Sequence, residues 1–94
     1  MTFRLSKSAE KDMRDVAVYI ARDNRPAARI WAENIREKCR MLGEMRDLGV
    51  RRDDLREGLK TYPVGNYLIL YKDMQNGVEI IRVMHGARDW QAYV

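Results

Sequence analysis

The side chains in this sequence that could do chemistry are few. There is one histidine, His85, and one cysteine, Cys39. An imidazole with an unperturbed pKa of about 6.5 is suited to general base catalysis, but a lone histidine that ends a strand is more often structural. Cys39 follows the apolar side of a helical pattern and is a predicted core residue. One histidine and one cysteine cannot supply the ligands of a standard zinc site. The sequence also has neither a glycine-rich phosphate loop nor a Gly-x-Ser-x-Gly turn. We therefore expect no metal and no cofactor.

Two short segments combine residue types that are suited to binding. Near the end of the chain, Arg88, Trp90 and Tyr93 place a fixed cation close to two large amphipathic rings. The alternative is that the two rings fold back to fill the core, which would leave Arg88 without a packing role. The second segment leads into a predicted strand and holds four cations: Arg51, Arg52, Arg56 and Lys60. That segment is either a basic binding surface or a solvated loop.

The net charge of +4 comes from 18 basic and 14 acidic residues, and it suggests nucleic acid as a partner. The charge is spread along the chain, at +3 over residues 1–50 and +1 over residues 51–94, so neither half is a polycation. Thirteen of the 18 cations are arginine. The arginine guanidinium can donate two parallel hydrogen bonds to a carboxylate as well as to a phosphate. The composition therefore also fits an acidic protein partner.

Two predicted helices would position these residues. Residues 3–5 alternate like a short strand, and Ser6 is a predicted N-cap for the first helix. Pro26 then ends one helical pattern and begins another. Each pattern has an apolar stripe at helical spacing: Met13, Val16, Ala17 and Ile20 in the first, and Ala28, Trp31, Ile35, Cys39, Leu42 and Met45 in the second. The short connection predicts that the helices are antiparallel.

A predicted sheet follows a polar connector over residues 50–57. Gly65-Asn66 and Asn76-Gly77 are turn signals, and the second pair suits the positive backbone angles of a tight hairpin. Both faces of the last strand are partly apolar, so we expect it to lie inside the sheet. The predicted strands are residues 59–64, 67–71 and 78–85.

The length of 94 residues fits one domain over residues 1–94. We expect an α+β sandwich, in which an N-terminal strand is followed by an antiparallel helix pair that packs on an antiparallel sheet, completed by a C-terminal three-stranded meander. The opposite, concave sheet face would be partly open, and a site is expected on that face and on the tail, residues 87–94.

The sequence also predicts a cellular location. The longest apolar run, residues 16–21, is too short to span a membrane, so no membrane partner is expected. Residues 1–7 do not form a secretory signal, and a single cysteine fits a reducing compartment. The expected location is the cytoplasm.

Short segments along nearly the whole chain form an ordered set. The first half contains Arg-Leu-Ser at 4–6, Ala-Glu-x-Asp at 9–12, Tyr-Ile-Ala-Arg-Asp-Asn at 19–24 and Pro-Ala-Ala at 26–28. The second half contains Gly-Leu-Lys at 58–60, Pro-Val-Gly-Asn-Tyr-Leu-Ile-Leu-Tyr at 63–71, Gly-Val-Glu-Ile at 77–80 and Arg-Val-Met-His-Gly-Ala-Arg-Asp at 82–89. In this order the segments resemble ParE-type toxins of the RelE/ParE toxin-antitoxin superfamily, including a His-x-x-Arg-like ending.

The resemblance implies the RelE/ParE fold, which agrees with the expected sandwich, and it implies an antitoxin partner. Such toxins are neutralised by a ParD-like protein that itself binds operator DNA, so the toxin would meet that DNA only indirectly. The antitoxin typically offers a helix and a strand to the helix pair and the sheet edge of the toxin. The antitoxin contacts expected from the resemblance are Tyr19, Trp31, Ile35, Tyr67 and Tyr71.

The resemblance implies two possible mechanisms. ParE-like toxins poison DNA gyrase, which is inhibition of a protein and not catalysis. Arginine and aromatic residues are enriched at binding hot spots, so the expected target contacts are Arg56, Lys60, Arg88, Trp90 and Tyr93.

RelE-like toxins instead cleave mRNA on the ribosome without a metal, by means of basic residues and a tail tyrosine. The candidates for that role are Lys60, His85, Arg88 and Tyr93. In RelE-like nucleases the segment after the first hairpin turn resembles Gly-Tyr-Arg, whereas this chain has Tyr67 in place of the arginine. The loss of that cation weakens the nuclease interpretation. The first interpretation is therefore a gyrase-inhibiting toxin that is not an enzyme. The alternatives are a metal-independent ribonuclease toxin and a non-toxic interaction module.

Overall fold

The computed structural model describes residues 3–94, and Met1 and Thr2 lie outside the described residues. Strand β1 (Phe3–Leu5) leads directly into helix α1 (Lys7–Ala21). The helix begins at the predicted cap, where Ser6 Oγ accepts a hydrogen bond of 3.0 Å from the Ala9 amide. This bond satisfies one of the amides that have no partner within the first turn of a helix.

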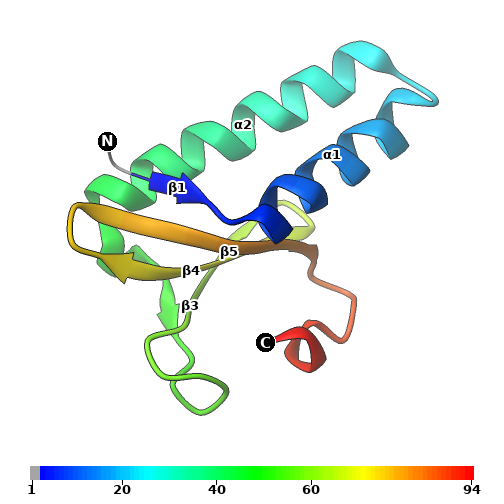
Figure 1. The fold of residues 1–94 in the computed structure, drawn as a ribbon. Helices are drawn as coiled ribbons and strands as arrows, with labels where there is room; N and C mark the ends of the chain where they lie inside the picture. The colour runs from blue at the N-terminus through cyan, green and yellow to red at the C-terminus, as the bar shows by residue number, and fades with distance from the viewer. Residues whose placement is uncertain (1–2) are drawn as a thin grey trace.

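Helix α2 (Arg25–Glu44) begins at a second cap, in which the Asn24 side chain accepts a 3.0 Å hydrogen bond from the Ala27 amide. Pro26 lies in the first turn, where its missing N–H is not needed. The two helices form the predicted hairpin and lie together on one side of the sheet (Figure 1). The buried residues of α2 follow the predicted stripe: Ala28, Ile35, Cys39 and Leu42.

Five strands form one sheet in the order β1-β5-β4-β3-β2. Strands β3 (Lys60–Val64), β4 (Tyr67–Met74) and β5 (Gly77–His85) are the predicted antiparallel meander. Strand β1 pairs in parallel with β5, so the sheet is mixed, and β5 has a neighbour on each side as expected. Strand β2 (Val50–Arg51) pairs with β3 inside the stretch that was predicted to be a connector, because two residues are too few to show a periodic pattern.

The β4–β5 hairpin has one backbone detail that differs from the prediction and one that was not predicted. Met74 pairs with Gly77, so Gln75 and Asn76 form the turn. Of the two residues predicted to form the turn, Gly77 has a positive φ, of 150°, and Asn76 does not. The predicted Asn76-Gly77 turn is therefore wrong by one residue. The register also shifts between Leu70 and Tyr71, and such a bulge increases the local twist of a strand.

The start of α1 covers the part of the β5 edge that β1 does not reach. The Ser6 amide donates to the Ile80 carbonyl oxygen at 3.0 Å, and Ser6 Oγ donates to the Ile81 carbonyl oxygen at 2.7 Å. The Val83 amide donates to the Asp12 carboxylate at 3.0 Å. Because unpaired backbone groups at a covered edge cost free energy, α1 here replaces a neighbouring strand.

The apolar residues form one cluster on each face of the sheet. The larger cluster fills the space between the helices and the sheet: Ala9, Met13, Ile35, Cys39, Leu42, Val64, Ile69, Tyr71, Val78, Ile80 and Val83. The smaller one lies on the opposite face: Leu59, Leu70, Met84 and Trp90. Trp90 comes from the tail, where a short 3-10 helix (Trp90–Tyr93) lies below the sheet in Figure 1. Trp90 thus covers the part of this face that Leu59, Leu70 and Met84 occupy.

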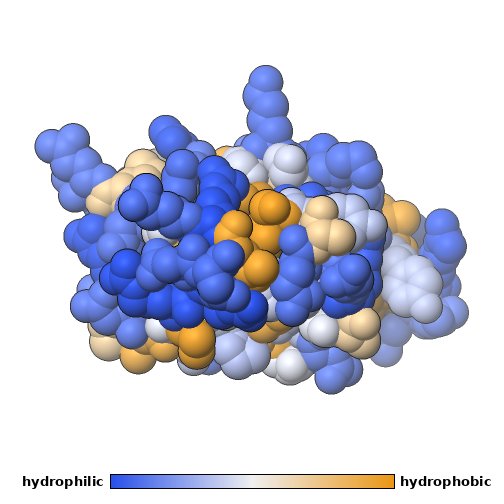
Figure 2. Space-filling model, turned by 90° about the horizontal axis from the view of Figure 1, so that it is seen from below, coloured by the Kyte–Doolittle hydropathy of each residue, from blue (hydrophilic) through white to orange (hydrophobic). Residues whose placement is uncertain are grey.

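The side of the molecule that carries the tail shows no continuous apolar surface. Figure 2 views the molecule from below, and hydrophilic side chains there surround small, separate hydrophobic areas. Trp90 is only 7% exposed, so its ring covers the smaller cluster. The tail therefore covers this part of the second face of the sheet.

Candidate functional site

The tail carries an exposed arginine and tyrosine close to the end of β5. Arg88 Nη2 donates to Tyr93 Oη at 3.0 Å, and the Arg88 guanidinium carbon lies 4.9 Å from the centre of the tyrosine ring. Trp90, in contrast, is packed among Leu59, Leu70 and Met84. Burial therefore corrects its predicted role as a target contact, and the alternative that its ring fills the core is confirmed.

A pocket of about 440 Å³ lies between α1 and the end of β5. His85 and Arg88 share it, and His85 Nδ1 accepts a 3.1 Å hydrogen bond from the Ala87 amide. In the neutral imidazole this bond leaves the proton on Nε2. The remaining lining residues come mainly from α1 and β5: Asp12, Asp15, Val16, Tyr19, Tyr67, Val83 and Met84. The pocket thus combines aromatic rings with charges of both signs.

Lys60 lies apart from this pocket. Its side chain is buried, and Nζ donates to Asp73 at 3.1 Å, to Asp47 at 3.2 Å and to the Arg46 carbonyl oxygen at 3.0 Å. Burial by itself would lower the pKa of Lys60, but the hydrogen bonds to the two carboxylates outweigh it and raise the pKa. Lys60 is thus held inside the fold, which corrects its prediction as a target contact or catalytic cation.

The register of the sheet shows how far Lys60 is from His85. Lys60 pairs with Tyr71, and His85 pairs with Tyr67 at the other end of β4. Four residues along a strand correspond to about 13 Å. The structure therefore brings His85, Arg88 and Tyr93 together and leaves Lys60 out.

The arginines before β3 are at the surface, and two of them pair with nearby carboxylates. Arg51 donates to Asp53 at 2.9 Å, and Arg52 donates to Asp54 at 3.0 Å; these hydrogen bonds raise the pKa of both arginines. The Arg52 guanidinium also lies 5.2 Å from the centre of the Trp90 ring. Arg56 is exposed and is in no ion pair among residues 3–94.

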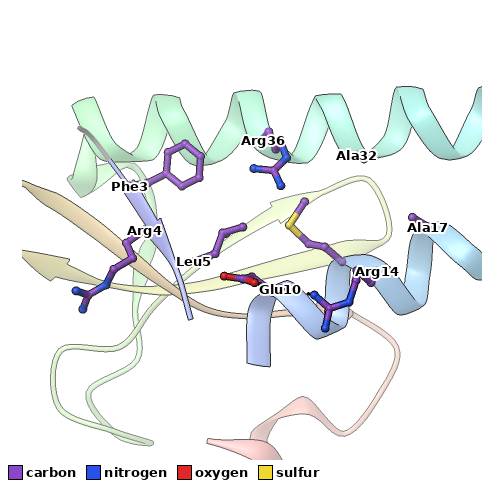
Figure 3. A pocket seen from close by; sticks show the side chains of 9 residues that line it. Phe3, Arg4, Leu5, Glu10, Arg14, Ala17, Ala32 and Arg36 are labelled. Carbon is purple, nitrogen blue, oxygen red and sulfur yellow. Dashed lines mark ion pairs between the residues drawn. The ribbon is translucent and has the colours of Figure 1, made fainter. Parts of the chain in front are cut away.

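A larger groove, of about 730 Å³, lies between α1, α2 and β1 (Figure 3). Arg14 and Arg36 lie at its rim, and Glu10 is 4.0 Å from Arg14. Arg4 points away from the groove, and it pairs with Glu79. The residues of the floor are apolar: Phe3, Leu5, Met13, Ala17 and Ala32.

The residues predicted to contact an antitoxin differ in how exposed their side chains are. Tyr19 is 68% exposed, while Trp31 and Tyr67 are half-buried, with ring centres 5.2 Å apart in an edge-to-face contact. Ile35 and Tyr71 are fully buried, so neither can contact a partner directly. Helical spacing placed Ile35 on the apolar side of α2, but the chain itself covers that side.

The described residues offer neither a metal site nor a membrane-spanning helix. Within residues 3–94, no three His, Cys, Asp or Glu side chains are grouped in a way that could hold a metal ion. The same part of the chain has no helix with the length and apolar character needed to span a membrane.

Comparison with known proteins identifies the family. A model of the family described as "ParE toxin of type II toxin-antitoxin system, parDE" matches residues 3–90. The chain belongs to the ParE toxin family. A solved structure described as the chromosomal ParDE TA system from P. aeruginosa has a TM-score of 0.74 at 16% sequence identity, over 90% of this chain and 95% of that chain. At this identity the likeness concerns the fold. No curated protein sequence matches the chain.

In this ParE-family chain, sequence reasoning missed the residues that frame both cavities. Asp12 binds Arg82 with two hydrogen bonds, of 2.7 and 2.9 Å, but the two residues are 70 positions apart, so no local pattern could pair them. The groove arginine Arg36 did leave a signal. Arg25, Arg29 and Arg36 recur at four and seven residues, which places them on one face of a helix.

Proposed function

We propose that this chain is the toxin of a cytoplasmic type II toxin-antitoxin module and that it stops growth by binding DNA gyrase. The family match over residues 3–90 supports the toxin class. The observation that carries the target contact is the exposed pair of Arg88 and Tyr93 beside the 440 Å³ pocket. Arginine and tyrosine are enriched at binding hot spots, and Arg56 is a further exposed candidate.

The arrangement of the candidate ribonuclease residues favours binding over catalysis. A general acid or base must lie within hydrogen-bond reach of the reacting group. Lys60 is buried against two carboxylates and lies about 13 Å along β4 from His85. His85 and Arg88 do share a pocket, with Tyr93 hydrogen-bonded to Arg88, and this supports ribosome-dependent mRNA cleavage as the second candidate function.

The groove between α1, α2 and β1 is the proposed binding site for a ParD-like antitoxin. Its apolar floor and its rim of Arg14 and Arg36 suit an amphipathic segment that has an apolar face and acidic residues beside it. The outer edge of β1 can accept a further strand. Contact with operator DNA would then pass through the antitoxin alone.

The proposed function is tested with purified gyrase and, in parallel, with ribosome-bound mRNA. The unchanged chain should inhibit supercoiling without cleaving mRNA, and it should arrest growth unless its antitoxin is co-expressed. Arg88→Ala and Tyr93→Leu should each weaken gyrase inhibition by about tenfold or more, the usual size of a hot-spot loss. Arg22→Ala, an exposed arginine at the far end of the helix hairpin, is the matched control. Cleavage of mRNA without gyrase inhibition would overturn the proposal.

Deletion of the tail is informative only if it spares Trp90. A chain that ends at Gly86 also loses the ring that covers Leu59, Leu70 and Met84, so a loss of activity could follow from instability. A chain that ends at Trp90 keeps that ring and loses Tyr93. We expect this shorter chain to bind antitoxin and to lose growth inhibition. Unchanged toxicity would contradict the role of the tail.

A further inference from the structure

The ring of Tyr93 lies close to two arginines that differ in how firmly they are held. The guanidinium carbon of Arg88 is 4.9 Å from the ring centre, and that of Arg82 is 5.7 Å from it. Arg88 is exposed, and within residues 3–94 its side chain donates one hydrogen bond, to Tyr93. Arg82 is on β5 and has a side chain that is only 22% exposed. Arg82 is therefore the more firmly held of the two arginines. We call its contact with the Tyr93 ring the clamp.

Asp12 of α1 fixes Arg82. One carboxylate oxygen accepts from Arg82 Nε at 2.7 Å, and the other accepts from Arg82 Nη2 at 2.9 Å. The first oxygen also accepts from the Val83 amide at 3.0 Å, which ties the carboxylate to the backbone of β5. A guanidinium held by two parallel hydrogen bonds has a fixed position and orientation, and its carbon lies 5.7 Å from the centre of the Tyr93 ring.

We infer that Asp12 and Arg82 are positioning residues for the tail, which hold Tyr93 at the surface next to Arg88. The tail has a separate attachment at Trp90, which is buried against the sheet and contacts the Arg52 guanidinium. Loss of Asp12 should therefore release Tyr93 and leave Trp90 in place. The effect on toxicity rests on the proposed function, whereas the release of Tyr93 does not.

A carboxypeptidase measures this release in the full-length protein, because it cleaves only chain ends that have left the folded surface. When opening and closing are fast, the cleavage rate follows the population of the open form. Asp12→Asn and Arg82→Lys should each speed the removal of Val94 and Tyr93 by about two- to fivefold, the loss expected for one exposed cation–aromatic contact. Lys11→Gln removes an exposed ion pair with Asp15 on the same helix and should leave the rate unchanged.

A second variant separates positioning from general stability. In a Tyr93→Leu background the clamp has no ring to hold, so Asp12→Asn should no longer change the rate at which the chain end is removed. An equal acceleration in both backgrounds would overturn the inference, and so would an unchanged rate in both positioning variants. If Asp12→Asn does not fold, Arg82→Lys still tests the clamp, because it keeps the charge that faces Asp12 and loses the flat guanidinium.

Gyrase inhibition by the same variants keeps the two proposals apart. Faster chain-end removal together with weaker inhibition supports both the clamp and the tail as target contact. Faster removal with unchanged inhibition supports the clamp and contradicts the tail as target contact.

Discussion

At the scale of single residues, burial decides what a charged side chain can do. Lys60 is 4% exposed and gives its hydrogen bonds to Asp47, Asp73 and the Arg46 carbonyl oxygen. The Asp47 and Asp73 side chains are 97% and 47% exposed, so water can solvate both carboxylates. The buried Lys60 ammonium group depends on them for its hydrogen bonds. Its role is to hold the segment before β2 against β3 and β4.

Replacement of Lys60 should therefore affect stability and not target binding. We expect Lys60→Met to lower the free energy of unfolding by about 1–3 kcal/mol, the range for hydrogen bonds to a charged group, as measured by urea denaturation. Lys72→Met, which breaks the more exposed pair with Glu79, should cost less than about 1 kcal/mol. Loss of gyrase inhibition by folded Lys60→Met protein would contradict this assignment.

Cys39 should be inert while the protein is folded. The thiol is fully buried in α2, and burial raises its pKa from 9.0 to about 12. Thiol reagents attack the thiolate, so labelling at neutral pH should require unfolding. The folded state binds this proton more tightly than the unfolded state, so the stabilisation is complete below pH 9.0 and is lost as the pH rises toward about 12. Cys39→Ala should remove that part of the pH dependence in alkaline urea titrations.

At the scale of elements, Gly49 sets the approach of the α2–β2 connection to β4. The Gly49 amide donates to Tyr71 Oη at 2.8 Å, and Tyr71 Oη donates to the Arg46 carbonyl oxygen at 2.9 Å. A Cβ on Gly49 would lie 2.2 Å from that phenol oxygen and 2.7 Å from the ring. Since Tyr71 is fully buried, it has no room to move away.

We expect Gly49→Ala to destabilise the protein by about 1–3 kcal/mol, as overpacking of a core does. The comparison is Gly86→Ala, whose new Cβ would meet the Asn66 carbonyl oxygen at 3.3 Å and should cost less. Thermal denaturation of both variants gives the measurement. Equal stability of Gly49→Ala and the parent would show that this contact is looser than described.

Local signals in the sequence predicted the elements better than their contacts. Ser6 caps the first helix as predicted, because a cap depends on residues only three positions away. The cap at Asn24 is equally local but was not predicted. Strand β2 and the bulge at Leu70 and Tyr71 were missed, because both depend on pairing with distant residues. The sequence predicted a strand over residues 67–71 but could not show that the α2–β2 connection covers Tyr71.

At the scale of the whole molecule, one face of α2 carries several arginines that are in no ion pair within the part of the chain that the structure describes. Cations near β2 pair with carboxylates within a few residues, as Arg51 does with Asp53. Arg25, Arg29 and Arg36 face one side of α2 and are exposed, and none of them is in an ion pair among residues 3–94. One face of α2, which borders the groove at Arg36, therefore carries three arginines without an ion pair among the described residues.

Reversal of one of these charges should weaken the proposed antitoxin complex. We expect Arg36→Glu to reduce affinity for the antitoxin by about tenfold, through the loss of one attraction and the gain of one repulsion. The salt dependence of binding should also decrease. Arg56→Glu makes the same change of charge in the loop before β3 and is the control for isothermal titration. Equal losses in the two variants would contradict the groove as the binding site.

The parallel pairing of β1 with β5 also has a kinetic consequence. The two strands join residues 75 positions apart, so β1 can add to the sheet only after a long loop has closed, and contacts of this kind tend to form late in folding. Leu5→Ala should then raise the unfolding rate and leave the folding rate nearly unchanged in stopped-flow experiments. Because Phe3 and Leu5 are also part of the groove floor, a partner that occupies the groove would hold this late-forming strand in place and lengthen the lifetime of the folded toxin.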